Sequence, residues 1–419
     1  MLFINRSYWP DVEATGQLLT ELCEDLADDF DVTVVCGRAR QIVDDVPPHA
    51  ELLRERNRVH IRRVRHTQFD KASFVGRLIN MVTFQLAATW SAVTAPCPAI
   101  VVVETDPPLL CLLGHLLQFM RRARLVCYLQ DIYPDIAVAL GKLKSGWTAT
   151  VLRRMFFHVY RQSDAVVVLS RDMRELLVDG GVPARIISIV PNWIDTSAVC
   201  PIKVNNRFRH EHDLEDKFVV MYSGNMGMSQ NLAQVLEAAE LLRGRDDIAI
   251  TMIGDGADRR NLERTASEKR LTNVRFYGYQ PKAELATSLS AADVHLVTLQ
   301  PHICRLLMPS KLYGAFASGT PVVAITSSSS ELADIVREHD LGKVVADGTA
   351  GALATAIATM ADQRDQSAAQ GERAREYAVD NCTRQSSVEQ MRTLLRRLVG
   401  DIGEQSLEPQ LAASAAAPR

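Results

Sequence analysis

Short apolar runs alternate with stretches of helical spacing along the first half of the chain. Five of these runs are predicted to be strands buried on both faces: 31–37, 99–105, 124–131, 164–170 and 186–192. Helical patterns, such as residues 16–30, lie between them. Buried strands that alternate with helices are typical of a parallel sheet covered by helices on both sides.

The second half repeats this alternation. Its predicted strands are 218–224, 248–256, 274–279, 293–299 and 320–325. The sequence therefore predicts an α/β protein with two Rossmann-like doubly wound domains that face each other across a cleft. The predicted domains are 1–196 and 217–375, the polar stretch 197–216 is a linker, the helix 376–400 packs back on the first domain, and the Ala/Ser/Pro-rich tail 401–419 is disordered.

Composition narrows the class of protein. The chain has 419 residues, is 47% hydrophobic and has a net charge of −3, which argues against a general nucleic-acid binder. Its eight cysteines are scattered, so we expect reduced thiols and a cytoplasmic protein. The chain enters its first predicted strand at once and has no apolar run of membrane-spanning length, so we expect neither signal peptide nor span.

The stretch LLMPSKLYGAFASGTPVVAI places a lysine at the start of a short predicted helix. Ser310 is expected to cap this helix, and Lys311 in its first turn opposes the helix dipole at a cost of ~0.3–1 kcal/mol. A bound phosphate would reverse this conflict, whereas the alternative is a solvated lysine. Gly314 costs roughly 1 kcal/mol relative to alanine within a helix, and it permits close approach of a ligand or of a facing helix.

Two glycine-rich turns follow strands in the second half. Gly224 and Gly227 stand between a strand and a helix, where backbone N–H groups can approach an anion. The alternative is an ordinary tight turn. Gly256 lies in a second such turn, whose Asp255 we expect to cap the next helix and not to contact ligand.

The first half offers a matching pair of features. Glu13, Thr15 and Gly16 lie in a loop that opens a helix, where backbone amides can point at a diphosphate or an acceptor hydroxyl. Asp131 follows a predicted strand, and its carboxylate could orient an acceptor hydroxyl. The alternative for Asp131 is a loop aspartate that caps the next turn.

These motifs together resemble the retaining glycosyltransferases of family 4, which have the GT-B fold. The resemblance extends over residues 1–400 and is strongest to bacterial enzymes of the colanic-acid and O-antigen type. It rests on YWPDVEATGQLLTEL, LQDIYPDIAVALG, VPNWID, YSGNMGMSQNL, IGDGADRRNLE, VRFYGYQPKAEL and MPSKLYGAFASGTPVVA. It implies a UDP- or GDP-sugar bound by the second domain, an acceptor on the first, retention of configuration, and no metal or other cofactor.

The resemblance also assigns roles to residues. Lys311 and Asp131 are the implied catalytic residues, and Glu13, Thr15 and Gly16 form the diphosphate or acceptor loop. The implied donor-binding residues are Gly224, Asn225, Gly227, Gly256, Tyr279, Gln280, Arg305, Ser310, Lys311 and Gly314.

The chain also departs from the broad family pattern. Asn225 and Gln230 stand where many members have arginine and lysine, and Gly314 and Leu306 stand where many have glutamate. Lys311, together with Arg305, is therefore expected to carry much of the leaving-group stabilisation.

Two basic segments of the first half adjoin apolar stretches. The first set is Arg54, Arg56, Arg58, Arg62, Arg63, Arg65, Lys71 and Arg77; the second is Arg121, Arg122, Arg124, Lys142, Lys144, Arg153, Arg154 and Arg161. Basic residues beside exposed apolar side chains suit an anionic membrane surface, where a lipid-linked saccharide acceptor would lie. The alternative is that the apolar parts are core helices and the charges a solvated rim.

Two other functions share the predicted architecture. One is a sugar-nucleotide 2-epimerase, which needs acidic groups near the sugar C2, and the other is an inactive sugar-nucleotide-binding scaffold. His210 and His212 are the nearest approach to a metal-ligand pair, and we expect them to be solvated.

Overall fold

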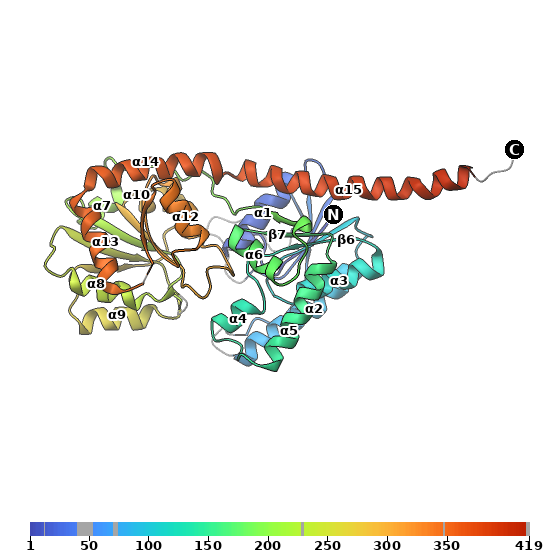
Figure 1. The fold of residues 1–419 in the computed structure, drawn as a ribbon, viewed down its shortest axis with the longest axis horizontal. Helices are drawn as coiled ribbons and strands as arrows, with labels where there is room; N and C mark the ends of the chain where they lie inside the picture. Colours follow the sequence, from blue (N-terminus) through green and yellow to red (C-terminus); the bar gives the residue numbers. More distant parts are fainter. Residues whose placement is uncertain (12, 40–52, 70–73, 228–229, 347, 416–419) are drawn as a thin grey trace. The chain divides into compact units, whose positions relative to one another are not determined.

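The computed structural model describes residues 1–419 except 12, 40–52, 70–73, 228–229, 347 and 416–419, and residues 74 and 401–415 by their backbone alone. The chain divides into two compact units, Met1–Pro191 with Ser387–Arg419, and Asn192–Ser386. Figure 1 shows the elements of each. All eight cysteines are free thiols.

The first unit is built on an eight-stranded sheet of order β3-β4-β2-β1-β5-β6-β7-β8. Its strands are β1 (Leu2–Ile4), β2 (Val32–Cys36), β3 (Glu55–Arg56), β4 (Val59–Arg63), β5 (Ile100–Val103), β6 (Arg124–Tyr128), β7 (Ala165–Val168) and β8 (Ile187–Ile189). Only the β3–β4 pairing is antiparallel. Apolar runs form the inner strands, of which β1, β5 and β7 are buried at every residue.

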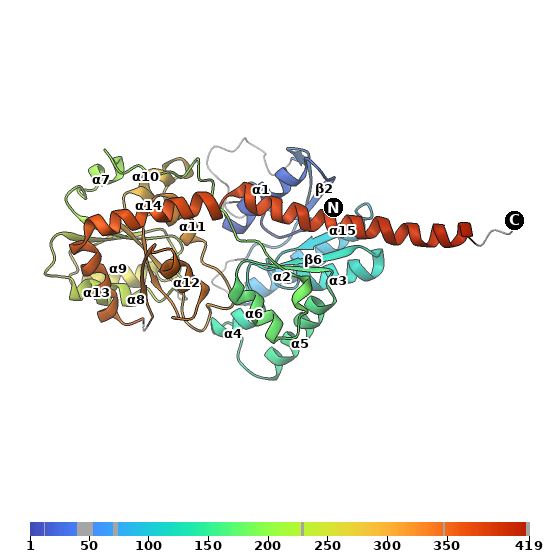
Figure 2. The ribbon, with the colours of Figure 1, turned by 45° about the horizontal axis from the view of Figure 1, so that its top comes forward.

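Helices cover both faces of this sheet. They are α1 (Ala14–Leu26), α2 (Phe74–Val93), α3 (Leu110–Arg121), α4 (Asp135–Ala139), α5 (Trp147–Gln162), α6 (Arg171–Asp179) and most of α15 (Arg384–Ala415). The chain runs from β1 to β2 in one direction across the sheet, and from β4 through β5 and β6 to β7 in the other. Because crossovers between parallel strands are right-handed, α1 lies on one face of the sheet and α2, α3 and α5 lie on the other. Figures 1 and 2 show α15 beside α1, where Arg392 bonds Asp29 at 2.6 Å.

The second unit has a six-stranded parallel sheet of order β11-β10-β9-β12-β13-β14. Its strands are β9 (Phe218–Ser223), β10 (Ile248–Ile253), β11 (Val274–Tyr277), β12 (Val294–Thr298), β13 (Val322–Ile325) and β14 (Gly342–Val345). Its helices are α7 (Arg207–Glu211), α8 (Ala233–Leu241), α9 (Arg259–Glu268), α10 (Leu285–Ser290), α11 (Lys311–Ala317), α12 (Glu331–Glu338), α13 (Ala350–Asp362) and α14 (Arg364–Asn381).

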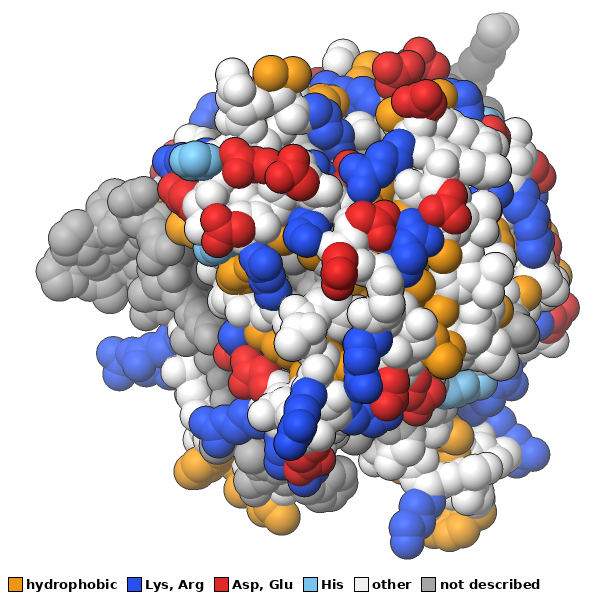
Figure 3. All heavy atoms as spheres, turned by 90° about the vertical axis from the view of Figure 1, so that its left-hand side faces the viewer, with side chains coloured by type: hydrophobic (Ala, Val, Ile, Leu, Met, Phe, Trp, Pro, Cys, Tyr) orange, Lys and Arg blue, Asp and Glu red, His pale blue; other side chains and the backbone are white. Residues whose placement is uncertain are grey.

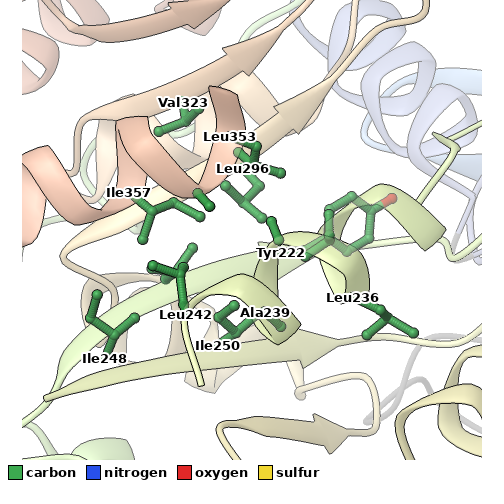
Figure 4. Packing of buried hydrophobic residues seen from close by; sticks show 14 of the residues in the cluster. Tyr222, Leu236, Ala239, Leu242, Ile248, Ile250, Leu296, Val323, Leu353 and Ile357 are labelled. Carbon is green, nitrogen blue, oxygen red and sulfur yellow. The ribbon is translucent and has the colours of Figure 1, made fainter. Parts of the chain in front are cut away.

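The core of the second unit fills the space between one face of this sheet and helices α8 and α13. Figure 4 shows Leu236 and Leu242 packed with Ile250 and Leu296 of the sheet and Ile357 of α13. All five side chains are buried, so the apolar runs and the apolar helix faces meet as their spacing predicts.

Three details differ from the predicted organisation. The second unit begins at Asn192, and the predicted linker carries the short helix α7, whose first turn is capped by Asn206. The predicted helix 376–400 falls partly in α14 and partly in α15, which meet at Cys382 and Thr383. Helix α15 also includes residues for which composition predicts disorder.

Candidate functional site

The carboxyl end of the second sheet has a topological switch point between β9 and β12. These two strands are neighbours, but β9 leads to β10 on one side and β12 leads to β13 on the other. Open α/β sheets bind ligands at such points, because the diverging connections leave a crevice. The glycine turn after β9 and the start of α11 both belong to this edge.

At Gly224, the glycine turn after β9 meets the start of α11. Its φ is +135°, which favours glycine, and a Cβ built on it would lie 2.6 Å from Lys311 Cε. Its N–H donates to the Ile253 carbonyl at 2.9 Å. Gly224 is therefore required both by its backbone conformation and by the close passage of the Lys311 side chain.

Lys311 is a partly buried cation without a counter-charge. Its Nζ lies 5.3 Å from the centroid of the Tyr222 ring, and burial lowers the pKa of the ammonium to about 8. No ion pair among the described residues includes Lys311. A desolvated, unpaired charge is costly in a folded protein, so this ammonium marks a site for an anionic ligand.

The structure corrects one expectation about α11, the cap by Ser310, and bears on the two alternatives for Gly314. Ser310 occupies the N-cap position, but it is helical in conformation and its side chain makes no capping hydrogen bond. Gly314 is explained by the facing helix α10, because a Cβ there would lie 3.2 Å from Leu289 Cδ1. This close approach is the facing-helix alternative, and the donor-binding role of Gly314 stays a prediction.

The loop after β9 is held by its neighbours. Asn225 is exposed and accepts the Tyr222 hydroxyl through its carbonyl at 2.6 Å. Gly227 is partly exposed and accepts the Gln230 N–H at 3.0 Å. Gln230 accepts in turn from the Thr298 hydroxyl at 2.9 Å, which ties the loop to the end of β12.

The second glycine turn packs against the first. A Cβ on Gly256 would lie 2.4 Å from the Met226 carbonyl. The expectation that Asp255 caps α9 is wrong, because its carboxylate accepts the Gly256 N–H at 2.8 Å and Asp258 holds the N-cap position. The two turns thus form one compact backbone cluster.

Other predicted donor-binding residues surround this edge. Tyr279 is 62% exposed, and its hydroxyl lies 3.5 Å from the Asp255 carbonyl. Such an open ring offers a face on which a nucleobase can stack. Gln280 bonds the Gly278 carbonyl at 3.1 Å, and Arg305 is partly buried in the connection between β12 and α11.

The first unit has its own switch point between β1 and β5. Arg6 follows β1 and forms ion pairs with Glu13 at 2.5 Å and with Asp106 at 2.7 Å. Glu13 holds the N-cap position of α1, but its side chain makes no capping hydrogen bond. The carboxylate pairs with Arg6 instead. Gly16 is buried, and no larger residue fits there, because a Cβ would lie 2.3 Å from Ser7 Oγ. Thr15 is partly exposed.

Asp131 follows β6 at this edge. Desolvation raises the pKa of its carboxyl to about 6, Lys142 lowers it, and Asp106 raises it. Pro134 holds the N-cap position of α4, so Asp131 is not the N-cap residue of that helix. Asp131 is therefore available to accept a hydrogen bond from a hydroxyl group.

Sequence reasoning missed two charged residues here, Arg6 and Glu104. Glu104 follows β5 and is 3% exposed, and desolvation together with Asp106 raises the pKa of its carboxyl. The signal was available, since each stands just past a fully apolar strand in LFINR and IVVVE. Because β5 and β6 are paired, Glu104 and Asp131 follow neighbouring strands.

The two edges differ in chemistry. The second unit presents a cation, glycine-rich backbone and an exposed aromatic ring, which together suit a nucleoside diphosphate. The first presents carboxyl groups, which suit hydroxyl groups. Within the described residues, no three His, Cys, Asp or Glu side chains gather as metal ligands, and no helix has the length and hydropathy to cross a membrane.

Comparison with known proteins identifies the family. The model for glycosyl transferases group 1 matches residues 204–377, and the model for a glycosyl transferase 4-like domain matches residues 14–193. Together they cover most of the chain and both units.

Two curated relatives are 31% identical over 245 residues. They are the "Probable glycosyltransferase WbjE" of Pseudomonas aeruginosa, matched over 58% of this chain and 61% of the relative, and the "Putative colanic acid biosynthesis glycosyl transferase WcaI" of Escherichia coli, matched over 56% and 59%. The chain thus spans about three fifths of the length of these relatives.

Solved structures share the fold. HepE of Anabaena in complex with UDP and glucose has a TM-score of 0.73 at 15% identity, covering 94% of this chain and 99% of that one. Sucrose-phosphate synthase from Thermosynechococcus elongatus has a TM-score of 0.75 at 17% identity, covering 96% and 100%. With two Rossmann-like units and both family models matched, the chain belongs to the family 4 glycosyltransferases of the GT-B fold.

Proposed function

We propose that the protein is a retaining glycosyltransferase. It transfers a hexosyl or deoxyhexosyl group from a UDP- or GDP-sugar to a lipid-linked saccharide, without a metal, in the synthesis of a bacterial surface polysaccharide. The reaction takes place at the inner face of the cytoplasmic membrane. The names of the relatives WbjE and WcaI support this class of activity.

The unpaired ammonium of Lys311 carries the proposal. It lies against Gly224 at the switch point of the second unit, where a diphosphate would supply the missing counter-charge. The Tyr222 ring is the partner found for this ammonium among the described residues, and an aromatic ring carries no formal charge to balance it.

The chemistry follows from this position. As the bond between the anomeric carbon and the diphosphate breaks, negative charge grows on the leaving phosphate oxygen. Lys311 and the backbone amides of the Gly224 turn stabilise that charge. The acceptor oxygen attacks the same face of the sugar, and its proton passes to an oxygen of the leaving phosphate. Asp131 of the first unit orients the acceptor hydroxyl by accepting its hydrogen bond.

The substitution Lys311→Met tests the proposal. Removing the ammonium should lower the rate of transfer about 10²–10³-fold and abolish stabilisation by UDP or GDP. It should also make the ligand-free protein more stable, because a pKa of about 8 in place of 10.5 reflects a cost of up to about 3 kcal/mol, reduced by partial exposure.

Thermal unfolding with and without each nucleotide measures both effects. Lys343→Met on the edge strand β14 is the matched control, and it should leave the nucleotide-induced shift unchanged. A Lys311→Met protein that still responds fully to nucleotides would remove Lys311 from the donor site. Nucleotide sugars screened in the same assay identify the donor, and an epimerised sugar formed from donor alone would point to an isomerase.

A further inference from the structure

Helix α2 is apolar on two opposite faces. One face is buried against the first sheet through Phe84, Ala88 and Ala92. The other is a regular exposed stripe of Val75, Leu78, Ile79, Val82, Leu86 and Trp90. A helix apolar on both faces is normally enclosed on both, so the outer stripe indicates a further partner.

The neighbouring helices α3 and α5 extend this apolar surface. Figures 1 and 2 show the three helices together on one face of the first sheet. Arg121 of α3 bonds the Val93 carbonyl of α2, and the rings of His115 and His158 join α3 to α5 at 6.0 Å between centroids. The added exposed side chains are Leu116, Phe119, Met120, Trp147 and Val151. We call the eleven exposed side chains of the three helices the outer helix surface.

The charge on these helices is entirely of one sign. Asp and Glu number 50 in the chain, yet α2, α3 and α5 contain none. The exposed basic residues on or beside them are Arg77, Arg122, Lys142, Lys144, Arg154 and Arg161, of which Arg77 already has an interaction within the chain. By contrast, acidic and basic side chains are interspersed on the face of the molecule in Figure 3.

The structure narrows the basic set predicted from sequence. Arg56 and Arg58 of the first segment pair with Glu24 and Asp28, and Lys71 lies outside the described residues. In the second segment, Arg124 pairs with Asp164 and Arg153 with Asp135. The predicted membrane contact therefore does not rest on these four arginines.

We propose that the outer helix surface docks on an anionic lipid bilayer. Its apolar side chains would enter the boundary between headgroups and acyl chains, with Trp90 and Trp147 at the interface and the basic residues on lipid phosphates. The inference deepens the proposed function, on which it rests for the lipid-linked acceptor. A second copy of the chain fits less well, because a two-fold contact would set this basic surface against itself without acidic partners.

Co-sedimentation with vesicles tests this surface. The full chain without donor is mixed with phosphatidylcholine vesicles, or with vesicles that also contain 30% phosphatidylglycerol. It should bind only the anionic vesicles. Leu86→Glu with Trp90→Glu should lower this binding at least tenfold, because two carboxylates would be set in the apolar stripe. Leu241→Glu, at a residue 64% exposed on α8 of the second unit, is the matched control and should bind as the unchanged protein does.

The outcomes separate this inference from the proposed function. Equal vesicle binding by the double variant, or no binding by the unchanged chain, overturns the docking surface. A dimer that the double variant converts to monomer, without vesicle binding, assigns the surface to a second copy instead. A far-UV circular dichroism spectrum and an unfolding transition that match those of the unchanged chain show that the double variant is folded. Loss of nucleotide-induced thermal stabilisation in the unchanged chain would contradict the donor site alone.

Discussion

Two residues of opposite charge have pKa values displaced toward neutrality. Burial lowers the pKa of Lys311 to about 8, and desolvation raises that of Asp131 to about 6. Both shifts are typical of groups whose charge is used by a ligand and not by a neighbouring side chain. Their combination predicts how transfer depends on pH.

We expect kcat/KM for transfer to rise through pH 6 and to fall above pH 8. Asp131 is a much stronger hydrogen-bond acceptor when it is ionised, and its raised pKa delays ionisation until about pH 6. Lys311 must be protonated to stabilise the leaving phosphate, and its lowered pKa removes the charge from about pH 8. Rates measured from pH 5 to 10 give both limbs. Asp131→Asn should remove only the acidic limb of the pH profile. If this limb is unchanged in the variant, Asp131 does not have the proposed role.

At the scale of elements, the strand-to-helix turns decide the donor site. Gly224 is held at φ +135° with Lys311 Cε 2.6 Å from the position of a Cβ. Gly224→Ala should therefore displace Lys311 and weaken nucleotide binding at least tenfold. Calorimetric titration with UDP and GDP measures the affinity.

Gly244→Ala is the control for that substitution. No atom lies within 4 Å of the Cβ it would add, so it should leave affinity unchanged and stabilise the protein by about 0.4–1 kcal/mol. Equal affinities for the two variants would show that the Gly224 turn does not touch the donor.

Elements differ in how far the sequence could predict them. Strands β5 and β7 are apolar at every position, so IVVV at 100–103 and AVVV at 165–168 could be predicted as strands. Strands β3 and β4 were missed because they form a sheet edge rich in arginine, where ERNRVHIRR has no continuous apolar run. β14 was missed because it begins with Gly342 and Lys343, which leave only two apolar residues, Val344 and Val345, in the strand.

At the scale of the whole molecule, the chain returns to its first unit through α15. Val388, Met391, Leu394, Leu395 and Leu398 are buried along this helix, and Arg396 bonds Asp29 at 2.8 Å. The spacing of these apolar residues is helical, so the buried face was readable in advance, and the sequence analysis also expected this part of the chain to pack on the first domain.

Leu395→Ala should destabilise the first unit by about 2–5 kcal/mol, because it leaves a cavity under a fully buried side chain. Val399→Ala on the same helix, at a residue 40% exposed, should change stability by less than about 0.5 kcal/mol. Calorimetry of unfolding compares the two. Nucleotide affinity should be the same in both variants, since the donor site is built from the second unit; a parallel loss of affinity would contradict that assignment.

The sequence by itself determined the two α/β units, the glycine turns and the lysine at a helix start. These follow from local periodicity and from backbone conformations that few residues can adopt. Only the tertiary structure decided which of the charged residues lack partners. It paired Glu13 with Arg6 and Arg56 with Glu24, and it turned an apolar face of α2 outward. It also placed Lys311 against Gly224, where no carboxylate of the described residues pairs with it. The physical reason is that desolvation and pairing depend on contacts between residues far apart in the chain, such as Gly224 and Lys311. A local sequence pattern does not show which distant residues come into contact.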